Sequence, residues 1–319
     1  MIVVCHLFVN YIPQKNLRLI RNITIIIKKN YGFHIAIADI RKYNADKDCC
    51  KAVKDYYCEG DYMNQLDTLR ESLGQCDEII LDALLMRNRI VEDIMAYKES
   101  NDLPILQPEQ EARKREWLIK RLEERRHQKE VTDVFSCITY NSKRIQARKL
   151  FEYNIFLIGF MGAGKTTVSD YLSGELAMDV VEMDQIIAQR QGMSISDIFE
   201  TYGEQYFRDL ETNLLVEMQS RSNVVVSCGG GTPMRECNVR EMKKNGRVVL
   251  LTAKPETILE RVKDNHDRPL LENNKSVDFI ADLMEKRREK YEAAADIVIE
   301  TDGKTTLEIC EEMIHRLHA

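Results

Sequence analysis

The stretch Asn154–Thr167, NIFLIGFMGAGKTT, decides how the second half of this 319-residue chain folds. An apolar run, Asn154–Ile158, leads into the pattern GxxxxGK[ST] at residues 159–166, and a helical stretch to Leu176 follows. Glycines let such a loop curl so that its N–H groups and the start of the helix point at phosphate oxygens. The residues predicted to hold a nucleotide are Gly159, Gly162, Ala163, Gly164, Lys165, Thr166 and Thr167.

Strands and helices alternate from this loop to the end of the sequence. Apolar runs at residues 223–229 (NVVVSCG) and 247–253 (RVVLLTA) have the composition of buried strands, and helical stretches lie between them. This order predicts an α/β domain with a parallel sheet over residues 153–319. In it, Lys165 is expected to reach the β- and γ-phosphates of ATP, and the Thr166 hydroxyl to ligate Mg²⁺.

Further motifs follow the loop, and together they resemble shikimate kinase. They are VEMDQII at 181–187, SISDIFETYGEQYFRDLE at 194–211, the triple glycine at 229–231, DRPLL at 267–271 and KRREKY at 286–291. Their order and spacing suit that family from about residue 154 onward, whereas other small P-loop kinases share the first motif but not this set. The resemblance implies transfer of the γ-phosphoryl group of ATP to shikimate.

The same resemblance implies which residues bind shikimate. Asp184 would hydrogen-bond the ring hydroxyls and orient the hydroxyl that attacks. Arg208 and Arg287 would hold the carboxylate, which suits the forked guanidinium group. The glycines expected beside them, where a side chain would block close approach of the backbone, are Gly229, Gly230 and Gly231.

Three more residues are implied on the nucleotide side of the site. Arg268 would lie in a mobile lid and contact the phosphates, and Arg261 would lie near the base. The family typically has Asp-x-Asp where this chain has Glu182-Met183-Asp184. Glu182 keeps the negative charge, so it is expected to assist Mg²⁺ from the outer shell.

Residues 63–150 have a helical pattern without strands. Apolar residues at helical spacing continue to about Lys98 with no proline, which predicts one helix from about Asn64 that is ~50 Å long. That length exceeds the ~26 Å diameter of a domain of ~90 residues, so a partner chain is expected to bury the apolar stripe. Two more helices are predicted, from Pro108 to about Arg126 and from Val131 to about Phe151.

This segment resembles the all-helical class of chorismate mutases. The matching stretches are LDTLRESLGQCDEIILDALLMRNRIVEDIMAYK at 66–98, NDLPILQPEQEARKREWL at 101–118 and VFSCITYNSKRIQ at 134–146. The resemblance implies an intertwined homodimer that rearranges chorismate to prephenate. The residues that match site positions of the family are Arg70, Arg87, Lys98, Glu111, Ser142 and Gln146.

In that family the site is a cage for one substrate conformer. By resemblance, Arg87 and the partner's Arg70 would pair with the two carboxylates, with Ser142 assisting. Lys98 and Gln146 would polarise the ether oxygen of the breaking bond. The residue that would accept a hydrogen bond from the ring hydroxyl is Glu111.

Helix geometry agrees with that division of roles. Arg87 and Lys98, eleven residues apart, fall within ~20° on one helix face, whereas Arg70 lies ~25 Å from Arg87 along the axis and can serve only a partner's site. The chain departs from the family at Gln107, where Asp is usual, and at Gln110, where Arg is usual.

Two alternatives stay open. Residues 63–150 could be a dimerisation or effector-binding module without activity, which the two glutamines favour. The P-loop domain could act on another small hydroxylated acid or sugar, against which the matching substrate residues argue.

Composition excludes several other classes of protein. The net charge of −6 gives no reason to expect nucleic acid as a partner. No apolar stretch reaches the ~18 residues of a membrane span, and no basic segment precedes Met1–Val9, so the sequence favours a cytoplasmic protein. Nine cysteines without a CxxC pair argue against a disulfide framework or a zinc site.

Residues 1–62 carry no motif to which a function attaches. They hold ten Lys and Arg residues against six Asp and Glu, and four of the nine cysteines. Glu59-Gly60 back-translates to a purine-rich sequence shortly before Met63. We therefore hypothesise that translation starts at Met63, the alternative being a basic extension that binds an acidic partner.

Overall fold

The computed structural model describes residues 22–29, 32–39, 65–262 and 276–318. They fall into two compact units, Met1–Ala83 and Leu84–Ala319. In the first unit, strand β1 (Asn22–Lys29) pairs antiparallel with β2 (Gly32–Asp39). Arg268 and the rest of the DRPLL motif lie outside the described residues.

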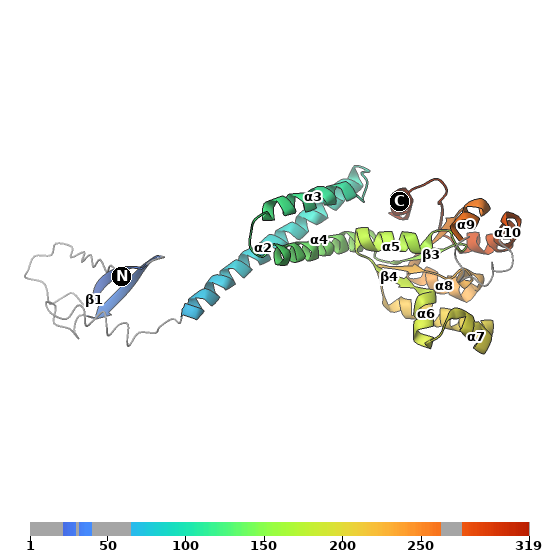
Figure 1. The fold of residues 1–319 in the computed structure, drawn as a ribbon, viewed down its shortest axis with the longest axis horizontal. Coiled ribbons are helices and arrows are strands. Elements are labelled where there is room, and N and C mark those ends of the chain that lie inside the picture. Colours follow the sequence, from blue (N-terminus) through green and yellow to red (C-terminus); the bar gives the residue numbers. More distant parts are fainter. Residues whose placement is uncertain (1–21, 30–31, 40–64, 263–275, 319) are drawn as a thin grey trace, which may run out of the picture. The chain divides into compact units, whose positions relative to one another are not determined.

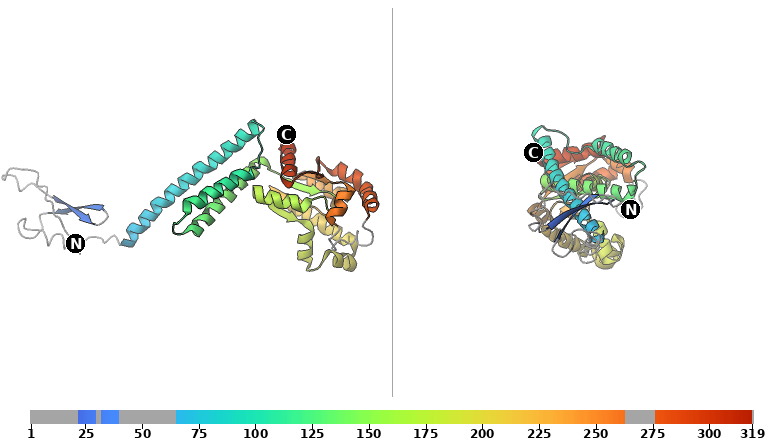
Figure 2. Two further views of the ribbon diagram at one scale, coloured as in Figure 1. Left: turned by 45° about the horizontal axis from the view of Figure 1, so that its top comes forward. Right: turned by 90° about the vertical axis from the view of Figure 1, so that its left-hand side faces the viewer.

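The three predicted helices are present. Helix α2 spans Gln65–Ser100, α3 spans Pro108–Leu122 and α4 spans Gln128–Leu150, and the last two lie side by side (Figure 2). The prediction that the second helix reaches Arg126 was wrong. Glu124 and His127 both have positive φ angles, 59° and 61°, which a right-handed helix does not allow.

The predicted α/β domain (Figure 1) has a five-stranded sheet. Its strand order is β4-β5-β3-β6-β7, and every pair is parallel. The strands are β3 (Asn154–Ile158), β4 (Asp179–Glu182), β5 (Val224–Ser227), β6 (Gly246–Thr252) and β7 (Ile297–Glu300). Because β3 is central, the loop that follows it lies at the carboxyl end of the sheet's middle strand, where α/β proteins bind ligands.

Helices cover both faces of this sheet. On one face lie α5 (Lys165–Leu176), α9 (Pro255–Val262) and α11 (Thr306–His318); on the other lie α6 (Met183–Gln191), α7 (Ile195–Glu217) and α8 (Glu236–Lys244). Helix α10 (Val277–Ala294) contributes to both cores, and short 3₁₀ turns occupy Met218–Ser220 and Thr232–Met234. Alternate residues of β3 enter opposite cores, which explains why the strand is apolar throughout.

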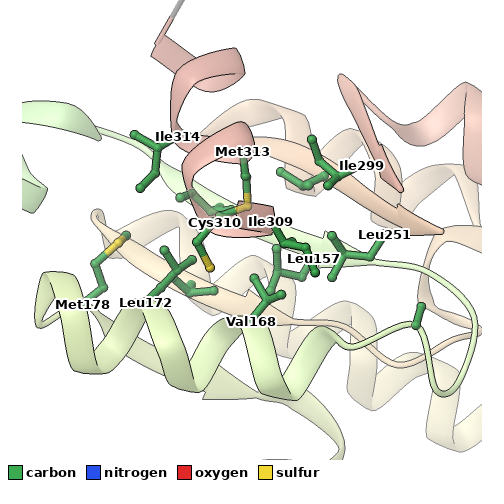
Figure 3. Close-up of a cluster of buried hydrophobic side chains, with 14 of the residues drawn as sticks. Leu157, Val168, Leu172, Met178, Leu251, Ile299, Ile309, Cys310, Met313 and Ile314 are labelled. Atoms are coloured by element: carbon green, nitrogen blue, oxygen red, sulfur yellow. The ribbon is translucent and has the colours of Figure 1, made fainter. Parts of the chain in front are cut away.

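The core under α5 and α11 extends beyond the α/β domain. Figure 3 shows Val168 and Leu172 of α5 facing Cys310 and Met313 of α11. The same cluster takes in apolar residues of the helical segment and its end, namely Met95, Leu106, Ala147, Leu150 and Phe151. Residues 84–150 and the α/β domain therefore share one hydrophobic core, and only three residues separate the end of α4 from the start of β3.

Candidate active sites

The loop between β3 and α5 has a backbone that only glycine can adopt at three positions. Gly159, Gly162 and Gly164 have φ angles of 143°, 79° and 101°. A Cβ on Gly159 would lie 2.3 Å from the carbonyl oxygen of Leu251. Lys165 folds back over the loop, where its Nζ donates to the carbonyl oxygens of Gly159 (2.9 Å) and Phe160 (3.2 Å). This curled backbone is the predicted phosphate cradle.

The residues expected near Mg²⁺ are joined through a serine that the sequence did not single out. Ser169 lies one turn after Thr166 on α5, and its hydroxyl donates to Glu182 Oε1 at 2.9 Å. In the described part of the chain, no three His, Cys, Asp or Glu side chains cluster as a metal site. The donor set fits Mg²⁺, which proteins commonly hold by one or two side chains together with phosphate oxygens.

A buried carboxylate organises the other side of the loop. The side chain of Glu211 is fully buried; it accepts a hydrogen bond from Arg208 Nη1 at 2.8 Å and another from the Thr232 hydroxyl. Burial raises the pKa of Glu211, and the Arg208 charge opposes that shift. For Arg208, burial is the largest single influence and lowers the pKa, but the charges and hydrogen bonds of Glu211 and Glu204 together outweigh it, so the pKa is raised overall. Arg208 is thereby held in one orientation.

The triple glycine brings the predicted substrate residues together. A Cβ on Gly229 would lie 2.8 Å from Asp184 Oδ1, and one on Gly231 would lie 2.3 Å from Arg208 Nη1. A Cβ on Gly230 would lie 3.8 Å from Arg287 Nη1. Asp184, Arg208 and Arg287, which are far apart in the sequence, therefore surround one short loop.

Helix α10 supplies a contact that sequence reasoning missed. The Tyr291 hydroxyl donates to the carbonyl oxygen of Gly230 at 2.6 Å and so fixes the middle of the triple glycine. Burial raises the pKa of Tyr291, with Arg287 opposing the shift. Tyr291 is the last residue of the KRREKY motif, and Glu211 follows Arg208 by three residues, about one helical turn, in FRDLE. Both residues could therefore have been predicted from the sequence.

Arg261 contacts the phosphate loop directly. Its Nη1 donates to the carbonyl oxygen of Gly162 and to the Thr301 hydroxyl, both at 3.1 Å. The guanidinium group therefore lies at the loop's edge, and its expected place beside the nucleotide stays a prediction.

In the helical segment, two predicted residues meet across α2 and α4. Arg87 Nη1 donates to the hydroxyl oxygen of Ser142, which in turn donates to the carbonyl oxygen of Ile138 at 2.8 Å. Burial lowers the pKa of Arg87. Gln146 is half-buried one turn beyond Ser142, on the same face of α4.

Lys98 is buried at the end of α2, where its Nζ donates to the carbonyl oxygen of Ile105 at 2.8 Å. Burial lowers its pKa, and the charges of Glu311 and Glu111 oppose that shift. Lys98 and Gln107 also line a hollow of about 360 Å³ against Ile90, Asp93, Ile94, Tyr97 and Leu103. Glu111 does not contact Lys98 directly; its Oε2 lies 2.7 Å from Lys143 Nζ.

Another lysine, Lys114, lies near Arg87 and Glu111. Burial and the repulsion of Arg87 lower the pKa of Lys114, and Glu111 opposes the shift. Lys114 is one turn after Gln110 on α3, so a positive charge lies beside the position where the family's arginine is missing. The four-residue spacing of Gln110 and Lys114 could have indicated this from the sequence.

Arg70 belongs to the other compact unit. Its side chain is exposed, and its Nη1 lies 3.0 Å from Asp67 Oδ1 on the same helix. The prediction that Arg70 binds substrate in a partner's site stays a prediction.

Among the described helices, none combines the length and apolar character that crossing a bilayer requires.

Comparison with known proteins divides the chain in the same way. The family model described as "Shikimate kinase" matches residues 161–318, and that described as "Chorismate mutase type II" matches residues 69–147. The chain is 44% identical to the shikimate kinase of Persephonella marina over 164 residues, covering 51% of this chain and 98% of that protein. It is 42% identical to that of a Sulfurihydrogenibium species over 164 residues, covering 51% and 97%.

Solved structures match the same half. Shikimate kinase from Acinetobacter baumannii in complex with shikimate is 34% identical, with a TM-score of 0.49 over 52% of this chain and 92% of that one. Shikimate kinase from Aquifex aeolicus is 40% identical, with a TM-score of 0.45 over 51% and 95%.

Proposed function

This chain belongs to the shikimate kinase family and carries a chorismate mutase type II segment before the kinase half, and we propose that it catalyses both reactions. One is the ATP-dependent phosphorylation of shikimate to shikimate 3-phosphate. The other is the rearrangement of chorismate to prephenate. Both reactions serve the synthesis of aromatic amino acids, and we expect them in the cytoplasm.

The pair of half-buried Arg208 with fully buried Glu211, beside the triple glycine, carries the kinase proposal. It presents a guanidinium group of fixed orientation, and Arg287 adds a second cation near the same loop. Two such groups suit a carboxylate, which each can bind through paired hydrogen bonds. Asp184 lies in the same cluster and would accept a hydrogen bond from the attacking hydroxyl.

The phosphate loop would hold ATP on the other side of that hydroxyl. Lys165 would leave the loop carbonyl oxygens for the β- and γ-phosphates, and Arg261 would border the base. Mg²⁺, held by Thr166 and assisted by Glu182, would neutralise charge on the phosphates when bound. Arg268 is proposed to add positive charge from the DRPLL segment.

Release of ADP in the presence of shikimate tests the kinase. Arg208→Ala should raise the KM for shikimate by roughly 10- to 100-fold, because a charge-assisted pair is lost. Arg190→Ala is the matched control: Arg190 pairs with Glu217 at 2.7 Å on the surface and should leave KM unchanged. Equal turnover of another hydroxylated acid would instead favour a different substrate.

The contact of Arg87 with Ser142 carries the mutase proposal. Lys98 is buried further along the same helix, and half-buried Gln146 lies one turn after Ser142 on α4. A unimolecular rearrangement needs no nucleophile; it needs groups that hold the reactive conformer and stabilise charge on the ether oxygen. Arg87 and Ser142 would bind a carboxylate, and Lys98 and Gln146 would donate to the ether oxygen. Glu111 would accept from the ring hydroxyl.

The proposed homodimer rests on exposed apolar residues. Large apolar side chains of α2 are about half exposed or more, and a single chain leaves them in water. Those that recur at helical spacing are Leu66, Leu69, Leu73, Ile80, Ile90 and Ile94. A partner's α2 would cover them and bring its Arg70 to the site.

Loss of the ultraviolet absorbance of chorismate tests the mutase. Arg87→Ala should abolish the loss, whereas Arg89→Ala, an exposed arginine two residues on, should not. A folded dimer that never consumes chorismate would leave the second candidate function, a kinase whose helical segment is a dimerisation or effector-binding module. The uncharged Gln107 and Gln110 favour that candidate.

A further inference from the structure

One face of α11, the last helix of the kinase half, contacts the end of α2 and the loop that follows it. Glu311 accepts two backbone hydrogen bonds there, from Leu106 N–H to Oε1 at 2.5 Å and from Ile105 N–H to Oε2 at 3.3 Å. One and two turns further, His315 lies 3.6 Å from Asp102 and His318 lies 3.5 Å from Glu99. The spacing of 311, 315 and 318 places all three on one helix face.

Apolar packing supports the same contact. Leu106 and Met95 are buried in one cluster with Cys310, Met313 and Ile314 of α11. The segment between α2 and α3 is therefore held by side-chain packing and by a carboxylate that satisfies two consecutive N–H groups. The carboxylate contact comes from α11, outside the mutase-like helices, whereas the apolar packing involves both α2 and α11.

This segment positions Lys98. The carbonyl oxygen of Ile105 accepts from Lys98 Nζ at 2.8 Å, while the N–H of Ile105 donates to Glu311. A shift of the Ile105 peptide would therefore move the ammonium group. Glu311 thus acts on Lys98 through one peptide unit.

A second link runs from α5, the helix that begins at the phosphate loop. Lys143 Nζ donates to the carbonyl oxygen of Gly174 at 2.8 Å and lies 3.6 Å from Glu175, both at the end of α5. The same ammonium group lies 2.7 Å from Glu111. A second candidate mutase residue is therefore also fixed to the kinase half.

We propose that Glu311 is a positioning residue for the mutase-like site, so that the kinase half is a working part of that site. The proposal rests on the mutase activity proposed above. It assigns Glu311 two tasks, to hold the Ile105–Leu106 backbone and to set the charge environment of Lys98. Glu111 of α3 is the other acidic group that acts on that ammonium.

Three variants on α11 test this. Glu311→Ala removes both acceptors, and Glu311→Gln keeps one carboxamide oxygen but loses the charge. Glu312→Gln is the matched control, because Glu312 pairs with Lys304 at 2.6 Å and Arg316 at 3.6 Å, both within the kinase half. Alanine is a strong helix former, so α11 should remain folded.

We expect kcat for chorismate to fall about tenfold in Glu311→Ala and about threefold in Glu311→Gln, since a small displacement of a catalytic group lowers the rate steeply. KM should change little, because Arg87 and Ser142 still bind the carboxylate. Shikimate kinase activity of the same preparations should stay at the wild-type level. In Glu311→Gln the basic limb of the kcat profile should move to lower pH, because loss of the nearby negative charge lowers the pKa of Lys98. Glu312→Gln should change neither kcat for chorismate nor the position of the basic limb.

Amide hydrogen exchange at Ile105 and Leu106 gives a readout without turnover. It should speed up in both Glu311 variants and not in Glu312→Gln. Unchanged exchange and unchanged kcat would overturn the proposal, and so would a parallel fall of both activities, which indicates general unfolding. If the wild-type chain consumes no chorismate, the mutase function itself fails, while the exchange data still decide whether Glu311 holds the segment.

Discussion

The two candidate sites of this chain are built in different ways. The shikimate site has its described parts within one α/β domain, around a fully buried Glu211 that holds Arg208 beside the triple glycine. The mutase-like site draws on three helices, relies on α5 and α11 of the kinase half for Lys143 and Lys98, and is proposed to need Arg70 from a second chain.

The difference follows from the folds. A parallel sheet buried on both faces provides a rigid edge where loops converge, so one chain suffices. A bundle of three helices has no such edge, and α2 leaves large apolar side chains exposed. Its site must therefore obtain rigidity from neighbours, either a partner chain or the domain that follows.

The largest effect is expected from Asp184→Asn. If Asp184 accepts the hydrogen bond of the attacking hydroxyl, kcat for shikimate should fall roughly 10²- to 10⁴-fold, the range for loss of an acid–base group. Chorismate turnover in the same preparation should not change, because Asp184 lies on α6, whereas the contacts described above between the mutase-like segment and the kinase half involve α5 and α11. A parallel loss of both activities in a folded variant would contradict the separation of the two sites.

Mixing defective subunits tests whether each site lies within one chain. Dimers formed from Arg70→Ala and Arg87→Ala chains have one intact site in each heterodimer, so mixing should restore about a quarter of the wild-type mutase rate. A mixture of Lys165→Ala and Asp184→Asn chains should restore no kinase activity. If both variants are inactive alone and the first mixture does not recover, Arg70 does not act in the partner's site; an Arg70→Ala chain that is active alone would place Arg70 outside the site.

The sequence predicted the elements of both regions well, because their signals are local. The glycine pattern 159–164, the apolar runs of β3, β5 and β6 and the length of α2 each depend on neighbouring residues alone. It predicted the end of α3 poorly, since Glu124 and His127 adopt positive φ without being glycine.

What it could not predict are contacts between distant segments. Nothing in the spacing of Glu311 indicates that it accepts hydrogen bonds from residues 205 and 206 positions earlier. Glu211 and Tyr291 were easier to predict, because each lies in a motif that contains an arginine predicted to bind substrate. Tertiary packing decides such contacts, and a single sequence does not record it.

A smaller effect is expected from alanine at two glycines of the kinase half. Gly231→Ala should raise the KM for shikimate by about tenfold, because its Cβ would displace the Arg208 guanidinium. Gly174→Ala is the control: its Cβ meets nothing within 4 Å, and alanine should stabilise α5 by about 0.5–1 kcal/mol. Steady-state kinetics and thermal unfolding measure the two effects. Equal KM values in both variants would remove the triple glycine from the substrate site.

The smallest effect, and the one most specific to the mutase-like site, is a fall of kcat for chorismate at high pH, the basic limb of its pH profile. Lys98 must be protonated to donate to the ether oxygen, and burial lowers its pKa, so kcat should fall with rising pH earlier than for an ordinary lysine. Lys98→Arg should remove the limb, because arginine stays charged throughout the range. Lys114→Arg should keep it, although the pKa of Lys114 is lowered too. If the fall of kcat at high pH persists in Lys98→Arg and disappears in Lys114→Arg, the titrating group is Lys114 on α3 and not Lys98. The missing arginine at Gln110 would then be replaced by its neighbour one turn away.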